Sequence, residues 1–375
     1  MQFAQSIDEQ NLDYFFEGNN PQWLNYLETH GFCVIRSQVS ENELTTTKNY
    51  IWEDLERLHG ANQSDENTWG KIPNHGPGIM GNELPQTKGP WLIRGLESIR
   101  NIFSQIWKTD ELLVSMDSVI LWLPWWKNKN WIPHSEGLHI DQNPFRKPDR
   151  CCVQGMVPLL DVTDITGGLE VIPFSHLSDA QNRFKLLHPY LERNFSDWCV
   201  VRNHDNKNAK PILLKAKAGD LILWDSRLIH GGKVGTGYQM IKNQNHEVSN
   251  ESNHESNRES NVMKTDDNTQ SSASERNQST NQSLHYQGLA RMAIPICMTP
   301  RSFASNKILE TRRRGFENGS TFTHWPHEAV VTNRIPKQKL SSSASNTTTS
   351  TETEKASTSI PYTPVSITTR VQELI

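Results

Sequence analysis

The chain lacks the features that mark secreted, membrane-spanning and nucleic-acid-binding proteins. It has no run of about 18 apolar residues, so we expect no membrane span. Its start, MQFAQSIDEQNLDYFFEGNN, is acidic and has no apolar centre, unlike a secretory signal. The formal net charge is −4, so no basic surface indicates nucleic acid. The last residues, ELI, are not a peroxisomal tripeptide. We therefore expect a cytoplasmic protein with neither nucleic-acid nor membrane partners.

Cysteine is also scarce, and its spacing excludes one class of metal site. The chain has 5 cysteines, and no two of them form a CxxC pair. An odd number of cysteines without a secretory signal favours reduced thiols. A cysteine-rich zinc site is therefore not expected, and candidate metal ligands must be sought among histidines and carboxylates.

Large apolar residues are missing from two stretches in particular. Only 35% of the residues are hydrophobic, and the deficit falls in the Asn/Ser-rich stretch 242–283 and in 338–358. Such segments bury too little apolar surface to offset the entropy of ordering. We expect a single domain at 1–337, interrupted by a disordered insertion at about 242–283. A low-complexity linker at 338–358 and a C-terminal segment at 359–375, docking back on the domain, should follow.

The remaining sequence predicts helices first and short strands afterwards. Ser40 is a candidate N-cap, with Glu43 completing a capping box. The stretch 90–107, PWLIRGLESIRNIFSQIW, predicts a helix, with Ile99, Ile102, Phe103 and Ile106 at helical spacing. From residue 114 onward, apolar or alternating segments broken by Gly and Pro predict a barrel or sandwich. These segments are VSMDSVILWLPWW, GLHID, CCVQGMVPLL, GGLEVIPFSH, KPILLKAKAGDLILWDSRLIH and ARMAIPICMT.

Two potential metal ligands stand two residues apart in the stretch EGLHIDQNPF. In a strand, His139 and Asp141 would point to the same face. With one more histidine they would form the two-histidine, one-carboxylate set of non-haem Fe(II) oxygenases. An HxD pair alone is weak evidence, and His134 with Glu136 forms a competing HxE pair nearby.

Two further residues are candidates for the same site. His230 ends an apolar strand in AGDLILWDSRLIHGG, and Arg291 leads the strand ARMAIPICMT. Taken alone, His230 could be a hydrogen-bonded core histidine and Arg291 an exposed strand-end arginine. Their combination with the HxD pair is what favours a functional interpretation.

Several motifs, in order, resemble the phytanoyl-CoA dioxygenase family of Fe(II)/2-oxoglutarate-dependent oxygenases. HGFCVIRSQVSENEL is similar to the family's N-terminal strand and helix, and GLHIDQNP to its HxD strand. DVTDITGGLEVIPFSH resembles its most recognisable stretch, and AGDLILWDSRLIHGG its distal-histidine strand. FTHWP and YTPVSITTRVQEL resemble its tail. The resemblance covers roughly residues 20–240 and 284–330.

The resemblance implies a fold, a cofactor set and a chemistry. It implies a mainly β fold with a double-stranded β-helix (jelly-roll, cupin-like) core and flanking N-terminal helices. It implies Fe(II) bound by His139, Asp141 and His230, with Arg291 pairing with the distal carboxylate of the cosubstrate 2-oxoglutarate. With O2 as second cosubstrate, the expected reaction is hydroxylation of a small-molecule or acyl substrate, releasing succinate and CO2. The presence of Asp141 argues against halogenation.

Two alternatives from other classes remain open on the sequence. The chain could be a catalytically silent jelly-roll that binds a metal or ligand. It could also be a zinc hydrolase with Glu136 as general base, although no further hydrolase motif is present. The sequence does not indicate the substrate or the oligomeric state.

Other conspicuous residues have structural interpretations. We expect His176 to support a turn or gate rather than to bind metal, and the TRRRG sequence at 311–315 to be a solvated basic turn rather than a site for an anionic substrate or cofactor group. Trp122 is expected in the core, whereas Trp125 and Trp126 follow Pro124 in a loop and either mark a contact surface or pack inward.

Overall fold

The computed structural model describes residues 13–73, 76–81, 83–201, 210–238, 288–332, 366 and 369–375, with only the backbone at 369 and 370. The predicted insertion at 242–283 and the predicted linker at 338–358 lie outside these residues. So does most of the C-terminal segment 359–375. No helix in the described part of the chain is long and apolar enough to cross a membrane.

Within the described residues, the larger of two β-sheets contains eight strands. Their spatial order is β1 (Phe15–Phe16), β2 (Phe32–Ile35), β11 (Leu221–Asp225), β7 (Val153–Pro158), β13 (Arg291–Pro300), β5 (Val119–Trp122) and β3 (Ile79–Met80), with β4 (Leu112–Val114) also pairing with β13. All neighbours are antiparallel except β1 and β2. Most of these strands are apolar on both faces, which suits a sheet covered on both sides.

The smaller sheet faces the larger one. Its order is β10 (Ile212–Leu213), β8 (Gly167–Ile172), β12 (Ile229–Val234), β6 (His139–Ile140) and β9 (Cys199–Val200), all antiparallel. Between β5 and β13 the chain passes repeatedly from one sheet to the other, as in a jelly-roll. The sheets stay open at their edges. The predicted mainly β, jelly-roll fold with flanking helices is confirmed.

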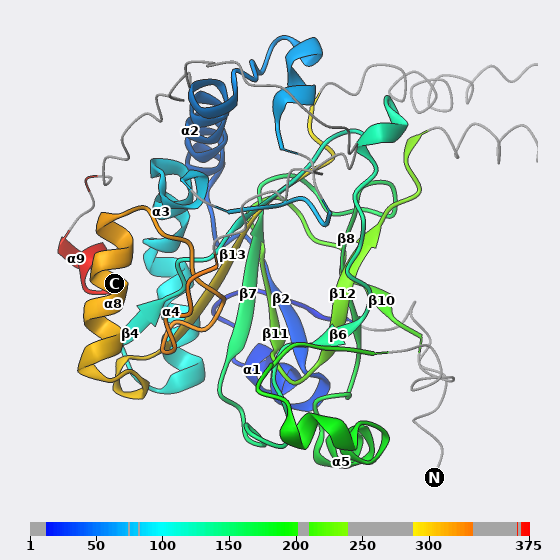
Figure 1. The fold of residues 1–375 in the computed structure, drawn as a ribbon, viewed down its shortest axis with the longest axis vertical. Helices are drawn as coiled ribbons and strands as arrows, with labels where there is room; N and C mark the ends of the chain where they lie inside the picture. The colour runs from blue at the N-terminus through cyan, green and yellow to red at the C-terminus, as the bar shows by residue number, and fades with distance from the viewer. Residues whose placement is uncertain are drawn as a thin grey trace, which may run out of the picture.

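Helices cover the outer face of the larger sheet (Figure 1). They are α2 (Glu41–His59), α3 (Lys88–Arg94), α4 (Glu97–Trp107) and α8 (Asn306–Glu317), while α1 (Gln22–His30) and α5 (Ser178–Leu187) lie at the lower end of the view and the short α9 (Thr369–Gln372) lies beside α8. Short 3-10 turns lie at Glu66–Lys71, Leu84–Gln86, Lys129–Trp131, Pro189–Arg193 (η5) and Arg301–Phe303. The capping box predicted at Ser40 is present, since its side chain accepts from the Glu43 backbone and the Glu43 side chain accepts in return.

The single helix predicted at 90–107 is wrong. The chain forms two helices, because Gly95 ends α3 and Leu96 is extended before α4. Glycine has low helix propensity, and here it also gives room to a neighbour. A Cβ on Gly95 would lie 2.6 Å from Cγ2 of Val371, which belongs to the C-terminal segment.

Apolar residues fill two layers. Trp23, Ile51 and Phe103 pack beneath the helices against Leu223 and Ile294 of the larger sheet. A second group fills part of the space between the sheets and includes Val34, Met156, Leu169, Val171 and Trp224. The two layers fix the sheets relative to each other, and the remaining space between the sheets is the cavity described below.

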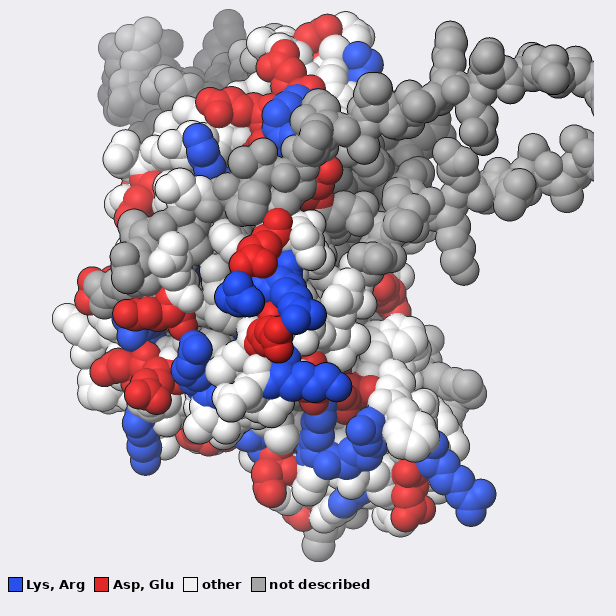
Figure 2. All heavy atoms as spheres, turned by 60° about the vertical axis from the view of Figure 1, so that its left-hand side comes forward, with Lys and Arg blue, Asp and Glu red and all other residues white. Residues whose placement is uncertain are grey.

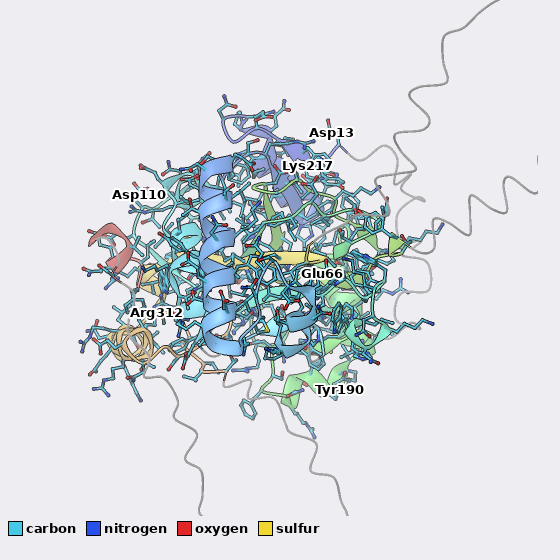
Figure 3. All side chains as sticks on the ribbon, turned by 90° about the horizontal axis from the view of Figure 1, so that it is seen from above. Asp13, Glu66, Asp110, Tyr190, Lys217 and Arg312 are labelled. Atoms are coloured by element: carbon cyan, nitrogen blue, oxygen red, sulfur yellow. The ribbon has the colours of Figure 1, made fainter. Side chains whose placement is uncertain are left out.

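The basic sequence at 311–315 is part of α8, so the predicted solvated turn is wrong. Ser305 caps the helix, and Arg313 and Arg314 are exposed and pair with glutamates one turn away. Arg312, labelled in Figure 3, is instead fully buried and donates to backbone oxygens of four residues. These are Val114, Pro326, Leu374 and Ile375, at 2.6 to 2.9 Å.

Candidate metal centre

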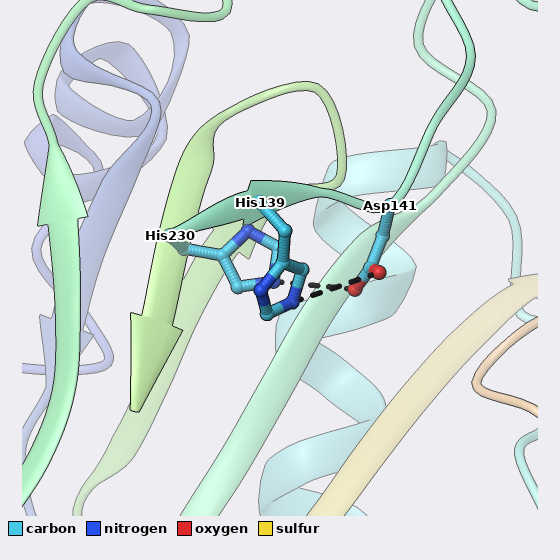
Figure 4. A group of neighbouring side chains, drawn as sticks. All are labelled: His139, Asp141 and His230. Carbon is cyan, nitrogen blue, oxygen red and sulfur yellow. Dashed lines mark hydrogen bonds and ion pairs between the residues drawn. The ribbon is translucent and has the colours of Figure 1, made fainter. Parts of the chain in front are cut away.

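The smaller sheet brings His139, Asp141 and His230 together from two strands (Figure 4). His139 lies in β6 and His230 in β12, where the two residues pair directly across the antiparallel ladder. Asp141 follows β6 at once and lies on the same face as His139, as the two-residue spacing predicts. The three side chains are referred to below as the triad.

The triad is compact enough to surround one ion. One potential ligand atom from each residue lies within 4.8 Å of the other two. His230 Nε2 lies 3.2 Å from Asp141 Oδ2, and His139 Nε2 lies 3.8 Å from Asp141 Oδ1. The ring centroids of the two histidines are 4.6 Å apart. Both histidines are buried, with Asp141 half-buried between them.

Backbone contacts orient both imidazoles toward the centre of the triad. Nδ1 of His139 lies 2.8 Å from the Gly137 carbonyl oxygen, and Nδ1 of His230 lies 2.8 Å from that of Leu228. A carbonyl oxygen only accepts, so each Nδ1 carries the proton. In a neutral imidazole the lone pair is then on Nε2, which faces the carboxylate. Such backbone partners are typical of histidines that bind metals.

This arrangement places acceptors against acceptors. The Nε2 lone pair of His230 faces Asp141 Oδ2 at 3.2 Å, a distance that is favourable only with a cation between the two atoms. A proton on Nε2 would meet this need for one histidine at a time. A divalent ion bound by all three groups would meet it for the whole triad. The donor set therefore fits a metal ion such as Fe(II).

The ionisation states also suit metal binding. Burial, and then the charge of His230, lower the pKa of His139, which favours the neutral ligand form. Burial alone would raise the pKa of Asp141, but in acid, where the imidazoles carry a proton on both nitrogens, the charge of His324, a hydrogen bond from His230 and the charge of His139 hold that pKa well below its usual range. Asp141 is therefore a carboxylate at neutral pH. Gln154 in β7 donates to its Oδ2 at 2.9 Å and fixes its orientation.

A cavity of about 440 Å³ opens above the triad, between the two sheets. Its wall contains all three triad residues and Arg291, the fourth predicted site residue. Most of the remaining wall is apolar and includes Trp122, Trp198 and Phe322. The volume is in the range of small-molecule sites in proteins.

Arg291 is a buried cation without a carboxylate partner among the described residues. Its side chain is 6% exposed, and burial lowers the pKa of its guanidinium from 12.5 to about 10. The guanidinium carbon lies 4.5 Å from the ring centre of Trp122, and Nη2 lies 3.2 Å from the sulfur of Met156. Nε is buried and has no hydrogen-bond partner in the described structure. A carboxylate entering the cavity would supply the missing partner.

The competing residues lie apart from the triad. His134 and Glu136 are exposed, and of the two only Glu136 reaches the cavity wall. The buried His176 contacts the Glu28 carbonyl oxygen through Nε2 at 3.0 Å, in keeping with the expected structural role. In the aromatic stretch Trp122 and Trp125 are buried, so Trp125 packs inward on Trp122.

His324 and Trp198 are among the wall residues that were not predicted. His324, from the FTHWP sequence, has a buried Nε2 with no hydrogen-bond partner in the described structure. Trp198 is 45% exposed, and its ring centre lies 6.0 Å from that of His139. Lys147 links the loop that carries Trp198 with the loop that carries His324, because its Nζ lies 2.6 Å from Asp197 and 2.5 Å from Glu328. The position of His324 inside a motif that resembles the family could have indicated a role. Nothing in the sequence distinguishes Trp198 from any other tryptophan in a loop.

The sequence model of the family PhyH, phytanoyl-CoA dioxygenase, matches residues 27–237, more than half of the chain. The chain belongs to the phytanoyl-CoA dioxygenase family. The match contains His139, Asp141 and His230 and ends before Arg291. Membership of this family agrees with the resemblance identified from the sequence motifs and makes the chain a relative of iron- and 2-oxoglutarate-dependent oxygenases.

Three proteins of similar sequence or fold are named after a biosynthesis. Ava biosynthesis cluster protein O of Aspergillus versicolor is 25% identical to this chain over 340 residues, which cover 85% of this chain and 91% of that protein. The carbocyclase SnoK from nogalamycin biosynthesis, a non-heme alpha ketoglutarate dependent enzyme, is 14% identical, with a TM-score of 0.43 and 77% and 85% of the two chains covered. The epimerase SnoN from the same biosynthesis is 14% identical, with a TM-score of 0.41 and 58% and 79% covered.

Proposed function

We propose that the chain is an Fe(II)- and 2-oxoglutarate-dependent dioxygenase that hydroxylates a small molecule. The observation that carries this proposal is that the wall of one cavity lacks a cation at one place and an anion at another. At the triad, lone pairs and a carboxylate face one another and need a cation. In the same wall, the buried guanidinium of Arg291 needs an anion. A metal ion together with a dicarboxylate would satisfy both.

The roles of the triad residues follow from their protonation. His139 and His230 would each offer Nε2, because their Nδ1 protons are held by backbone carbonyls. Asp141 would offer a carboxylate oxygen, and Gln154 would keep that carboxylate from rotating. Iron held by these three residues would supply the oxidation with O2 and 2-oxoglutarate as cosubstrates, and 2-oxoglutarate would be converted to succinate and CO2.

Arg291 would bind one carboxylate of 2-oxoglutarate and leave the other end of the molecule facing the triad. Its planar guanidinium offers two parallel donors, which match a carboxylate. Trp122 and Met156 hold the guanidinium without neutralising it. Because an unpaired charge in this wall is costly, the pairing should contribute strongly to cosubstrate affinity.

The rest of the cavity supports a small, largely apolar substrate with at least one polar group. Trp198 and Phe322 offer apolar surface, and Nε2 of His324 is a buried group still open to a hydrogen bond. His324 would bind a hydroxyl, carbonyl or amide of the substrate and so orient the carbon to be oxidised. The residues named here do not select one compound, and untargeted metabolite profiling with and without the protein would identify it.

The proposal is tested by metal binding and by succinate release. Alanine at any triad position should abolish Fe(II)-dependent conversion of 2-oxoglutarate to succinate and weaken Mn(II) binding at least tenfold, with the fold retained by circular dichroism. His134→Ala is the matched control, since this exposed histidine should leave both quantities unchanged.

Three outcomes would contradict the proposal. Metal binding without succinate release under any substrate mixture would favour a silent binding protein. Loss of metal binding in Glu136→Ala, together with its retention in Asp141→Ala, would move the site to the HxE pair. Hydrolysis with zinc that depends on Glu136 would favour the metallohydrolase interpretation.

A further inference from the structure

Large exposed apolar side chains are concentrated at the end of the molecule next to the cavity. Of the eleven in the described residues, seven lie between Leu177 and Val200, in and around α5, η5 and β9. They are Leu177, Leu186, Leu187, Tyr190, Phe195, Trp198 and Val200. This group, called the mouth patch below, is too concentrated to be the scattered exposure of an ordinary surface.

The mouth patch belongs to an ordered part of the chain. The side-chain amide of the buried Asn143 lies 3.0 to 3.3 Å from three carbonyl oxygens of the loop that carries Phe195. Arg146 donates to the Phe195 carbonyl, and Lys147 pairs with Asp197. The fixed loop holds the Phe195 side chain 84% exposed, and Leu186 at the end of α5 is 82% exposed. These side chains are therefore held exposed by a well-bonded part of the chain.

The mouth patch combines the residue types that favour a membrane surface. Tyrosine, phenylalanine and tryptophan are all exposed within a few residues of one another, and the first and last of these prefer the bilayer interface. Tyr190 lies at the outer edge of the molecule in Figure 3. At a membrane interface, these rings and the leucines of the mouth patch would be removed from water without the need for a complementary protein groove.

Basic residues are in excess around the mouth patch, although the whole chain has a net charge of −4. The guanidinium of Arg146 lies over the Phe195 ring at 5.4 Å, and Lys185 and Arg193 are close by in sequence. Residues 177–200 contain three basic side chains (Arg183, Lys185 and Arg193) and three acidic ones (Asp179, Glu192 and Asp197), so the excess of positive charge comes from Arg146 and Lys147 of the adjoining loop, where Lys147 pairs with Asp197. Figure 2 shows Lys and Arg side chains, with some Asp and Glu, interspersed with uncharged ones at the lower end of the molecule, where α5 lies in Figure 1. Cations beside apolar anchors match anionic lipid headgroups.

We propose that the mouth patch binds an anionic membrane surface and that a membrane-dissolved substrate reaches the cavity past Trp198. Trp198 belongs both to the mouth patch and to the cavity wall, so the two are continuous. The substrate route rests on the proposed function, whereas the membrane contact does not. The absence of a long apolar run, which led us to expect no membrane partner, bears on spanning a bilayer and not on peripheral contact.

The test is co-sedimentation of the full chain with vesicles of phosphatidylcholine alone or mixed with phosphatidylserine. The parent protein should sediment with the mixed vesicles, more weakly with phosphatidylcholine, and less at high salt. Phe195→Ser and Leu186→Ser should each lower partitioning about tenfold, as expected when one large apolar anchor is lost. Phe303→Ser is the matched control, because this exposed ring contacts Trp107, away from the mouth patch.

The outcomes separate this inference from the proposed function. No sedimentation of the parent, or equal sedimentation of parent and Phe195→Ser, overturns the membrane contact. A parent dimer that becomes a monomer in Phe195→Ser, without vesicle binding, would assign the patch to a second copy and also overturn it. Mn(II) and 2-oxoglutarate binding is measured on the same samples. If the parent protein binds neither Mn(II) nor 2-oxoglutarate, the proposed function is contradicted, while vesicle binding stands as an independent result.

Discussion

Replacing Arg291 with methionine should stabilise the protein without ligand while removing its response to 2-oxoglutarate. Burial lowers the pKa of the guanidinium from 12.5 to about 10, which corresponds to about 3 kcal/mol against holding the charge there. The contact with Trp122 returns about 1–2 kcal/mol. Methionine would keep an unbranched stem against Met156 and Trp122 without the charge. The net gain in unfolding free energy should therefore be about 1–2 kcal/mol.

Thermal unfolding in the presence and absence of 2-oxoglutarate and Mn(II) measures both effects. A gain of 1 kcal/mol raises the Tm by about 2–4 °C in a domain of roughly this size. For the parent protein, 2-oxoglutarate at about a hundred times its Kd should add about 2.7 kcal/mol. The Arg291→Met variant should begin with a higher Tm and show no further rise with 2-oxoglutarate. Mn(II) alone should stabilise both proteins equally, because the triad is unchanged.

Arg291→Lys separates the charge from the geometry of the guanidinium. Lysine keeps the charge but loses the two parallel donors, so the apparent KM for 2-oxoglutarate should rise about tenfold, or about 1.4 kcal/mol. The reasoning is refuted if Arg291→Met lowers the Tm without ligand, or if either variant responds to 2-oxoglutarate like the parent. In the latter case the carboxylate is held by other residues of the cavity wall.

Three further predictions concern the surroundings of the site. His324→Phe should leave Mn(II) and 2-oxoglutarate binding unchanged but lower substrate-dependent succinate release at least tenfold, whereas His327→Phe, outside the cavity wall, should not. Gln154→Leu should weaken Mn(II) binding about tenfold, measured by titration, because Asp141 is then free to rotate. Burial raises the pKa of Asp225, but its contacts with Arg227 and Arg150 lower it to about 2. Its stabilisation is therefore complete above pH 4 and lost as the pH falls through 2. In acid unfolding series, the parent should lose about 2 kcal/mol across this range that Asp225→Asn does not lose.

The grouping of His139, Asp141 and His230 could be predicted from the sequence, in part because some of its information is local. The two-residue spacing of His139 and Asp141 already places both side chains on one face of a strand. The position of His230 at the end of a buried strand marked it as unusual. The direct pairing of β6 with β12 is a long-range contact that no local pattern contains. The ordered motifs of the family resemblance supplied it instead.

Residues whose role depends on three-dimensional neighbours could not be predicted. Gln154 is one polar residue in the apolar strand CCVQGMVPLL, and its hydrogen bond with Asp141 joins the two sheets. The break at Gly95 depends on Val371, which lies far along the chain. Arg312 looks like its exposed neighbours in sequence, and only the docking of Leu374 and Ile375 against α8 makes it a buried hydrogen-bond centre.

The charges without partners in the cavity wall are explained by ligand binding and not by the stability of the empty protein. Stability alone would favour pairing Arg291 with a carboxylate of the protein and separating Asp141 from the lone pairs of the two histidines. Instead, one part of the cavity wall places the Asp141 carboxylate against imidazole lone pairs without a cation between them. Another part contains the Arg291 guanidinium without an anion. Each arrangement destabilises the empty protein, and each is relieved only by a ligand of the opposite kind. A metal ion and a dicarboxylate bound together would remove both, so their binding should be cooperative, with each raising the affinity for the other.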